Sequence, residues 1–328
     1  MITEKGFDSA FAAFEGLREA IGTVIVGHDN VVSAALIALL CRGNVLLEGV
    51  PGLGKTLLVR TLASALGLTF SRIQFTPDLM PADIIGTDII TEEEGHRRFT
   101  FSQGPVFAHV VLADEINRAT PKTQSALLEA MQERTVTVGS NTYTLDEPYI
   151  VLATQNPIEM EGTYPLPEAQ IDRFLLKANV EFPSLQELDL ISERTTEGAG
   201  IELPDPVATA EDVLEARRAV FEIPISEGLR SYVSRLVLAT HPGNPVAPQR
   251  VAEYVEYGGS PRAAIAVVLA AKAHAFLSGE VSVRPADIEA VFQQALHHRV
   301  ILNFRGEAEG VQVADLLDDV WRGVRAVQ

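Results

Sequence analysis

The stretch that most constrains the fold of this chain is Gly49–Thr56, GVPGLGKT, which directly follows the apolar run Asn44–Glu48. A strand, a glycine-rich turn and a helix in this order form a phosphate-binding loop, in which backbone N–H groups and the start of the helix face the anion. Lys55 can reach the terminal phosphates, and the Thr56 hydroxyl can ligate Mg²⁺. The motif predicts a nucleotide site, and a plain glycine-rich turn is the alternative.

The first 180 residues alternate short apolar runs with helical patterns, which is typical of an α/β fold with a parallel sheet covered by helices. Near-continuous apolar strands suit a sheet that is buried on both faces. The predicted strands are Asn44–Glu48, Thr69–Phe75, His109–Ala113, Tyr149–Thr154 and Phe174–Val180. The predicted helices are Leu53–Leu66, Pro121–Glu133 and a short one around Glu168–Arg173.

Two segments of the first half alternate polar and apolar residues around a polar turn. These are Thr87–Ser102, which turns near Glu92–Gly95, and Thr135–Leu145, which turns near Gly139–Asn141. Each pattern predicts a β-hairpin inserted into the α/β core. Hairpins with polar tips usually project, so we expect them to meet a partner or a neighbouring subunit.

After Pro183 the pattern changes to amphipathic helices, and 328 residues exceed what one hydrophobic core usually supports. We therefore predict two domains, an α/β nucleotide-binding core at residues 1–183 and an all-helical domain at residues 184–328. The predicted helices of the second domain are Leu185–Arg194, Ala210–Phe221, Ser226–Thr240, Pro261–Phe276, Pro285–Leu296 and Gly310–Val324.

The chain is acidic, with 26 Lys and Arg against 44 Asp and Glu, a formal charge of −18. Such a charge opposes binding to nucleic acid and to acidic membrane surfaces. The single cysteine, Cys41, cannot form an internal disulfide, which fits a reducing compartment. The first residues lack the apolar core of a secretion signal, and the apolar runs are too short to span a bilayer. We expect a cytoplasmic protein without membrane insertion or a nucleic-acid partner.

A pair of adjacent carboxylates, Asp114 and Glu115, ends the apolar run His109–Ala113. The carboxyl ends of parallel strands face the ligand in this fold class. One carboxylate can hold Mg²⁺ through water while the next orients the water that attacks the γ-phosphate. We predict that Asp114 serves the metal and Glu115 the water. Two solvated acids in a loop are the alternative.

Two further polar residues flank later strands. Asn156 follows the predicted strand Tyr149–Thr154, where its amide could orient the attacking water or sense the γ-phosphate, although Asn is also common in turns. Arg173 precedes the last strand on the side where a neighbouring subunit could receive it. The alternative for Arg173 is an ion pair with Asp172 or Glu168.

Arg262 follows Ser260 and Pro261, which form a good N-cap and first-turn pair. It therefore falls in the first turn of a helix, where a cation opposes the helix dipole. An incoming phosphate would supply the missing negative charge, and so would a local carboxylate.

The order of these motifs resembles that of the AAA+ ATPases over nearly the whole chain. GVPGLGKT corresponds to the Walker A motif, HVVLADE to Walker B, Asn156 to sensor 1, Arg173 to the arginine finger and Arg262 to sensor 2. Longer segments are similar to the MoxR family, in which a hairpin is inserted in the helix after the second strand. These segments are RIQFTPDLMPADIIG, GPVFAHVVLADEINRA, ATQNPIEMEGTYPLPEAQIDRF and GGSPRA.

This resemblance implies Mg²⁺-dependent ATP hydrolysis to ADP and a ring of identical subunits, often a hexamer. It also implies a chaperone-like role in maturing or activating client proteins, and partners that carry a von Willebrand factor A domain, which this chain lacks. It further implies that the second domain is a lid over the nucleotide. The implied nucleotide contacts are Val26, Gly27, Gly49, Val50, Pro51, Gly52, Leu53, Gly54, Lys55, Thr56 and Leu57.

Two other functions are compatible with a nucleotide-binding loop. A DNA-directed motor is disfavoured by the acidic charge and by the lack of an appended DNA-binding module. An ATP-gated scaffold that does not hydrolyse ATP is disfavoured by the intact pair Asp114 and Glu115. The aromatic-hydrophobic-glycine pore loop of threading unfoldases has no evident counterpart, so we expect the hairpins to contact the client.

Overall fold

The computed structural model describes residues 4–93, 96–156, 163–196 and 202–325. The turn of the first predicted hairpin at residues 94–95 lies outside these ranges. So do residues 157–162 of the segment that follows Asn156, and residues 198–201 of the glycine-rich join between the domains.

A five-stranded parallel sheet in the order β2-β5-β8-β1-β9 forms the centre of the first domain. Every predicted strand is present, with its ends within two residues of the prediction. The strands are β1 Val45–Glu48, β2 Phe70–Gln74, β5 Val110–Asp114, β8 Ile150–Gln155 and β9 Leu176–Asn179. The register pairs Gln74 with Asp114 and Glu48 with Gln155, so these strand ends meet at one edge of the sheet.

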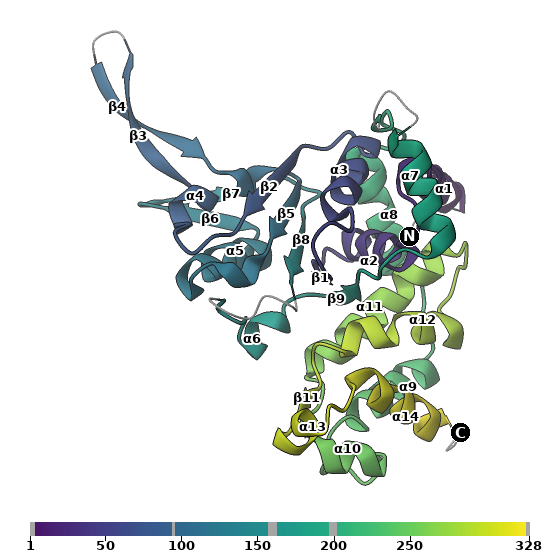
Figure 1. The fold of residues 1–328 in the computed structure, drawn as a ribbon. Coiled ribbons are helices and arrows are strands. Elements are labelled where there is room, and N and C mark those ends of the chain that lie inside the picture. Colours follow the sequence, from purple (N-terminus) through teal and green to yellow (C-terminus); the bar gives the residue numbers. More distant parts are fainter. Residues whose placement is uncertain (1–3, 94–95, 157–162, 197–201, 326–328) are drawn as a thin grey trace.

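Helices cover both faces of this sheet, as Figure 1 shows. Alternate residues of each strand pack to opposite sides, so that Val110 and Leu112 join one buried cluster while Val111 and Ala113 join the other. The helices of this part are α1 Glu4–Val24, α2 Asp29–Leu40, α3 Lys55–Ala65, α4 Pro81–Ile85, α5 Pro121–Glu133 and α6 Glu168–Ile171, with short 3₁₀ turns η1 Pro105–Phe107 and η2 Ile116–Arg118.

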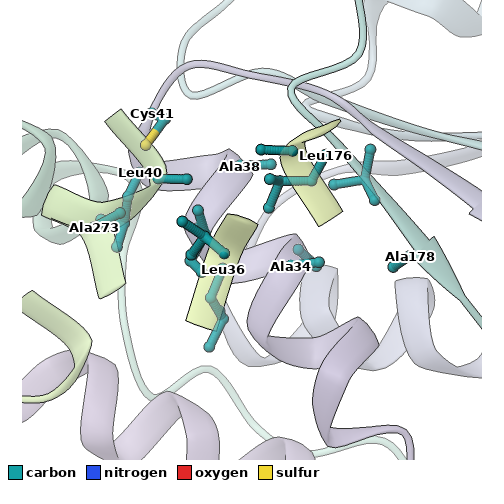
Figure 2. Close-up of a cluster of buried hydrophobic side chains, with 14 of the residues drawn as sticks. Ala34, Leu36, Ala38, Leu40, Cys41, Leu176, Ala178 and Ala273 are labelled. Atoms are coloured by element: carbon teal, nitrogen blue, oxygen red, sulfur yellow. The ribbon is translucent and has the colours of Figure 1, made fainter. Parts of the chain in front are cut away.

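Helix α2 lies at the centre of the larger buried cluster (Figure 2). It is apolar on almost every side, because it packs against β9, through Leu176 and Ala178, and against α11 Pro261–Leu277, through Ala273. Cys41 follows it, buried, and burial raises the pKa of its thiol to about 12. The thiol is therefore a packing group rather than a nucleophile.

Both predicted hairpins are present. The first pairs β3 Gly86–Glu93 with β4 His96–Gln103, and the second pairs β6 Thr135–Val138 with β7 Asn141–Thr144. The β3–β4 hairpin projects from the body of the molecule (Figure 1). Its base is held where the Phe101 ring stacks on Tyr143 of β7, with centroids 4.1 Å apart.

The second part of the chain is helical, as predicted, with one addition. A short antiparallel pair, β10 Val255–Tyr257 with β11 Ile301–Leu302, joins two of its loops, so the part is not all-α. Helices α10 and α13 were not predicted. Beside α11, the helices are α7 Leu185–Thr196, α8 Ala210–Glu222, α9 Glu227–Leu238, α10 Gln249–Tyr254, α12 Pro285–Leu296, α13 Phe304–Ala308 and α14 Val313–Arg325.

Helix α8 packs against α1 and α2 of the first part, and α12 packs against β9. The two parts therefore share a continuous core, and the division at residue 183 stays a prediction. No helix in the described ranges has the length and apolarity of a bilayer span.

Candidate functional site

The loop between β1 and α3 has the backbone that the glycine pattern predicts. Gly52 and Gly54 have φ angles of 85° and 74°, in the left-handed region that favours glycine. Gly49 is required for a different reason, because a Cβ there would lie 2.8 Å from the carbonyl oxygen of Val180. The loop thus ends at the N-terminus of α3, whose free N–H groups and dipole favour an anion.

A cavity of about 240 Å³ lies between this loop and the carboxyl ends of β2, β5 and β8. It brings together most of the residues predicted to act on the phosphates. The predicted residues that line it are Pro51, Gly52, Gly54, Lys55, Thr56, Asp114, Glu115 and Asn156.

Lys55 donates to the carbonyl oxygen of Gly49 across 2.6 Å. Its partial burial lowers the pKa of the ammonium, while the charges of Asp114 and Glu115 act to raise it. The ammonium therefore lies near the two carboxylates and close to the turn of the loop, where a polyphosphate would give it a stronger partner than a single carbonyl.

Thr154, the penultimate residue of β8, holds the two acids of β5 in place. Its hydroxyl donates to Oδ1 of Asp114 across 2.7 Å and accepts from the backbone N–H of Glu115 across 2.8 Å. Thr154 is almost fully buried, so these contacts are shielded from water. Thr154 was not predicted as a site residue, although its place at the end of a predicted strand was a usable signal.

Glu115 has a left-handed backbone, with φ 57° and ψ 49°. This conformation costs a residue with a side chain about 1–2 kcal/mol. The carboxylate accepts from Gln74 Nε2 at 2.9 Å and from Arg118 Nη1 at 2.8 Å, both at Oε2. Such local strain is common where a side chain must be aimed at a ligand, and here it turns Glu115 toward the cavity that it lines.

Two polar residues of β2 also line the phosphate cavity and were not predicted to act there. Arg72 donates from Nε and Nη2 to Oδ2 of Asp114, at 3.1 and 2.6 Å, and Gln74 contacts Glu115. Both residues alternate with apolar ones at the carboxyl end of a strand next to β5. That period of two was the signal that could have identified them.

A second, larger cavity of about 660 Å³ adjoins the first, since Gly52 and Gly54 line both. Its walls are mainly apolar, which suits the base of a nucleotide. Of the implied nucleotide contacts, Val26 and Leu57 line this cavity, whereas Gly27 does not, and a Cβ on Gly27 would lie 2.4 Å from Oε1 of Glu187. The other apolar residues that line it are Val24, Ile25, Leu53, Phe182, Leu188 and Ile191.

Arg173 lies outside both cavities, exposed, in the turn between α6 and β9. Its Nη1 donates to the carbonyl oxygen of Leu128 across 3.4 Å, a long contact. The ion pairs of Asp172 are formed with other arginines. The arginine-finger role of Arg173 in a neighbouring subunit stays a prediction.

Arg262 also lies outside the phosphate cavity, in the first turn of α11. Its Nη1 is 3.6 Å from Oδ2 of Asp172, so a carboxylate provides the negative charge that its position requires. Asp172 also pairs with the buried Arg299 at 2.7 Å and accepts from Ser260. The sensor role of Arg262 toward a phosphate stays a prediction.

The chemistry of the donor set fits a magnesium ion. Thr56 and Asp114 supply a hydroxyl and a carboxylate in the wall of one cavity, and hard oxygen donors of this kind are what Mg²⁺ prefers beside phosphates. The arrangement can hold a nucleotide polyphosphate and place a carboxylate, Glu115, where it could act on a water.

Comparisons with known proteins agree with this geometry. Residues 44–176 match the ATPase family associated with various cellular activities (AAA), and residues 247–320 match the AAA lid domain. Chaperone MoxR1 of Mycobacterium tuberculosis is 44% identical over 93% of this chain and 80% of its own length. Protein MoxR of Methylorubrum extorquens is 33% identical over 97% of this chain and 95% of its own length.

A crystal structure of an inferred ATPase from Cytophaga hutchinsonii superposes with a TM-score of 0.91 at 41% sequence identity, covering 98% of this chain and 96% of the other. The likeness thus extends over both the nucleotide-binding part and the helical part. The chain belongs to the MoxR family of AAA+ ATPases.

Proposed function

We propose that this protein hydrolyses ATP with Mg²⁺ and uses the cycle to remodel or activate partner proteins. The observation that carries the proposal is the phosphate cavity in which Lys55, Asp114 and Glu115 converge, joined at the glycine loop to an apolar cavity of suitable size for a base. An anion site, a carboxylate that can hold a metal and a second carboxylate that can act as a base are the parts that hydrolysis of a phosphoanhydride requires.

Each residue has a distinct part in this mechanism. The backbone N–H groups of the loop and Lys55 bind and orient the phosphates. Thr56 and Asp114 would hold Mg²⁺, which supplies positive charge against the β- and γ-phosphates. Glu115 accepts a proton from the attacking water, and Asn156 orients that water or contacts the γ-phosphate.

Assembly into a ring would complete the site. Arg173 is exposed and has no strong partner in its own subunit among the described contacts, which supports its delivery to the nucleotide of a neighbour. We propose a homo-oligomeric ring, a hexamer, as in the family. An arginine supplied in this way contributes about 10³- to 10⁵-fold in rate.

The projecting hairpin β3–β4 is our candidate for the contact with a client protein. Ile90 and Phe99 face each other across its two strands and are 63% and 78% exposed. A relative of this chain is named a chaperone, and exposed apolar side chains are what an unfolded or immature client would bind. We propose further that a partner with a von Willebrand factor A domain presents the client, in the cytoplasm, where ATP and a reduced Cys41 are both expected.

The test is the rate of ATP hydrolysis per subunit against protein concentration, with mass determination in the presence and absence of ATP. We expect the specific rate to rise as the ring assembles. Arg173→Ala should lose about 10³-fold or more in rate while it still binds ATP. Arg322→Ala, which removes a highly exposed arginine of α14, is the matched control and should behave as the parent.

A specific rate that is independent of concentration and unchanged in Arg173→Ala would exclude the trans arginine. ATP binding without turnover at any concentration, with or without a client, would instead indicate a nucleotide-gated scaffold. Stimulation of the rate by DNA that decreases with salt would indicate a DNA-directed motor.

A further inference from the structure

Arg72 forms an ion pair with Asp114, the predicted metal ligand. Its guanidinium donates twice to Oδ2 of Asp114, at 2.6 and 3.1 Å, from the neighbouring strand β2. The other oxygen, Oδ1, accepts from the Thr154 hydroxyl. Both oxygens of the carboxylate therefore have partners, and one of those partners is a cation.

The same guanidinium is linked to the second acid. Arg72 Nη2 also donates to Gln74 Oε1 at 2.6 Å, and Gln74 Nε2 donates to Oε2 of Glu115 at 2.9 Å. A continuous chain of hydrogen bonds thus runs from Asp114 through Arg72 and Gln74 to Glu115. A displacement of Arg72 would remove the partner that orients the amide of Gln74.

The burial of the pair makes such a displacement feasible. The Arg72 side chain is 46% exposed, whereas that of Asp114 is 13% exposed. Because water reaches the arginine of this pair, the pair contributes only about 1 kcal/mol, so a divalent cation can compete with it. Arg72 also lines the phosphate cavity, so a guanidinium released from Asp114 has phosphate oxygens within the same space as alternative partners.

We propose that Arg72 is a positioning residue that competes with Mg²⁺ for Asp114 and transmits the arrival of the metal to Glu115 through Gln74. In the absence of the metal, Arg72 neutralises Asp114 and keeps Gln74 against Glu115. When the metal engages Asp114, the guanidinium turns toward the phosphates and Gln74 loses one of its partners. The inference rests on the proposed function, because it concerns the same nucleotide site.

The test measures binding of a fluorescent ADP analogue as a function of Mg²⁺ concentration, which needs no hydrolysis. Arg72→Ala should lower the Mg²⁺ concentration for half-maximal binding by about two- to fivefold, since the competing cation is gone. Arg72→Gln, which keeps a hydrogen-bond donor without the charge, should show the same shift. Arg72→Lys should restore the parental midpoint in part.

Two control variants separate this effect from a general disturbance. Gln74→Ala breaks the contact with Glu115 but leaves the cation on Asp114, so its Mg²⁺ midpoint should match the parent while its turnover falls. Arg98→Ala, on the exposed strand β4, should change neither quantity. Melting curves of each variant show whether it is folded.

Equal Mg²⁺ midpoints in the parent and in folded Arg72→Ala or Arg72→Gln would overturn the inference while leaving the ATPase proposal intact. A shift of the same size in Gln74→Ala would also overturn it, because the effect would not come from the charge on Asp114. Failure of the parent to bind the nucleotide would overturn the proposed function itself.

Discussion

The hydroxyl of Thr154 contacts both acids at the carboxyl end of β5. Its oxygen donates to Asp114 and accepts from the N–H of Glu115, so it orients one acid by its side chain and the other by its backbone. The left-handed backbone of Glu115 is kept in place by this contact and by two further donors at its carboxylate. The strain of a single residue is thus balanced by three hydrogen bonds from different elements.

At this scale we expect Glu115→Gln to bind ATP and to lose turnover. The amide has nearly the size of the carboxylate but cannot accept a proton from water, and general-base catalysis contributes about 10²- to 10⁴-fold in rate. Single-turnover hydrolysis and equilibrium nucleotide binding measure the two effects separately. A Glu115→Gln variant that turned over at the parental rate would remove Glu115 from the base role.

Most described side chains of the β3–β4 hairpin are exposed to solvent. Its base is anchored by the stacked rings of Phe101 and Tyr143, whereas Phe99, two residues along the same face, is exposed opposite Ile90. A two-stranded hairpin on its own is marginally stable in water, and apolar side chains that stay exposed add little to its stability. The exposed pair Ile90 and Phe99 therefore supports our proposal that a partner binds this face.

We expect the double variant Ile90→Thr with Phe99→Thr to lose affinity for an unfolded polypeptide. Casein can serve as the probe, and its binding should weaken at least about tenfold, since two apolar contacts are removed. Thr keeps the strand preference, so ATP binding should match the parent. The single variant Ile89→Thr, the same change on the opposite face of the hairpin, is the control. Unchanged binding of casein by the double variant would argue against this face as the client contact.

In the whole molecule, the helical part is fixed to the nucleotide-binding part by a buried charge. Arg299 lies between α12 and β11, and its side chain is 3% exposed. It pairs with Asp172 and donates to the carbonyl oxygens of Phe174 and Leu175, which immediately precede β9. Asp172 also contacts Arg262 in the first turn of α11. A movement of that turn can therefore be transmitted to β9, which pairs with β1.

We expect Arg299→Met to lower the free energy of unfolding by about 3–5 kcal/mol, because the substitution leaves Asp172 and several carbonyl oxygens without their main donor. Urea unfolding followed by circular dichroism measures the change. Arg250→Ala, which breaks the exposed pair with Asp319, is the control and should cost about 1 kcal/mol or less. A loss in Arg299→Met no larger than in this control would mean that the pair does not hold the two parts together.

Much of this arrangement could be predicted along the chain. The glycine loop, the paired acids at the end of β5 and both hairpins were identified, because each depends on residues close in sequence. Helix α2 was not predicted as a helix, because its burial on every side removes the polar stripe that marks a helical period. The sequence left open whether a phosphate or a carboxylate balances the charge of Arg262. In the structure the carboxylate of Asp172, ninety positions earlier, contacts it.

The sequence by itself determined the strands, the phosphate loop and the acidic pair, since local spacing sets the backbone turn and the end of the strand at which these residues emerge. Only the tertiary structure decided which side chains share the cavity. Arg72 and Gln74 reach Asp114 and Glu115 because β2 pairs with β5, and Thr154 reaches both acids because β8 pairs with β5 on its other side. These contacts join residues about forty positions apart, so strand pairing in space, rather than any local pattern, brings them together.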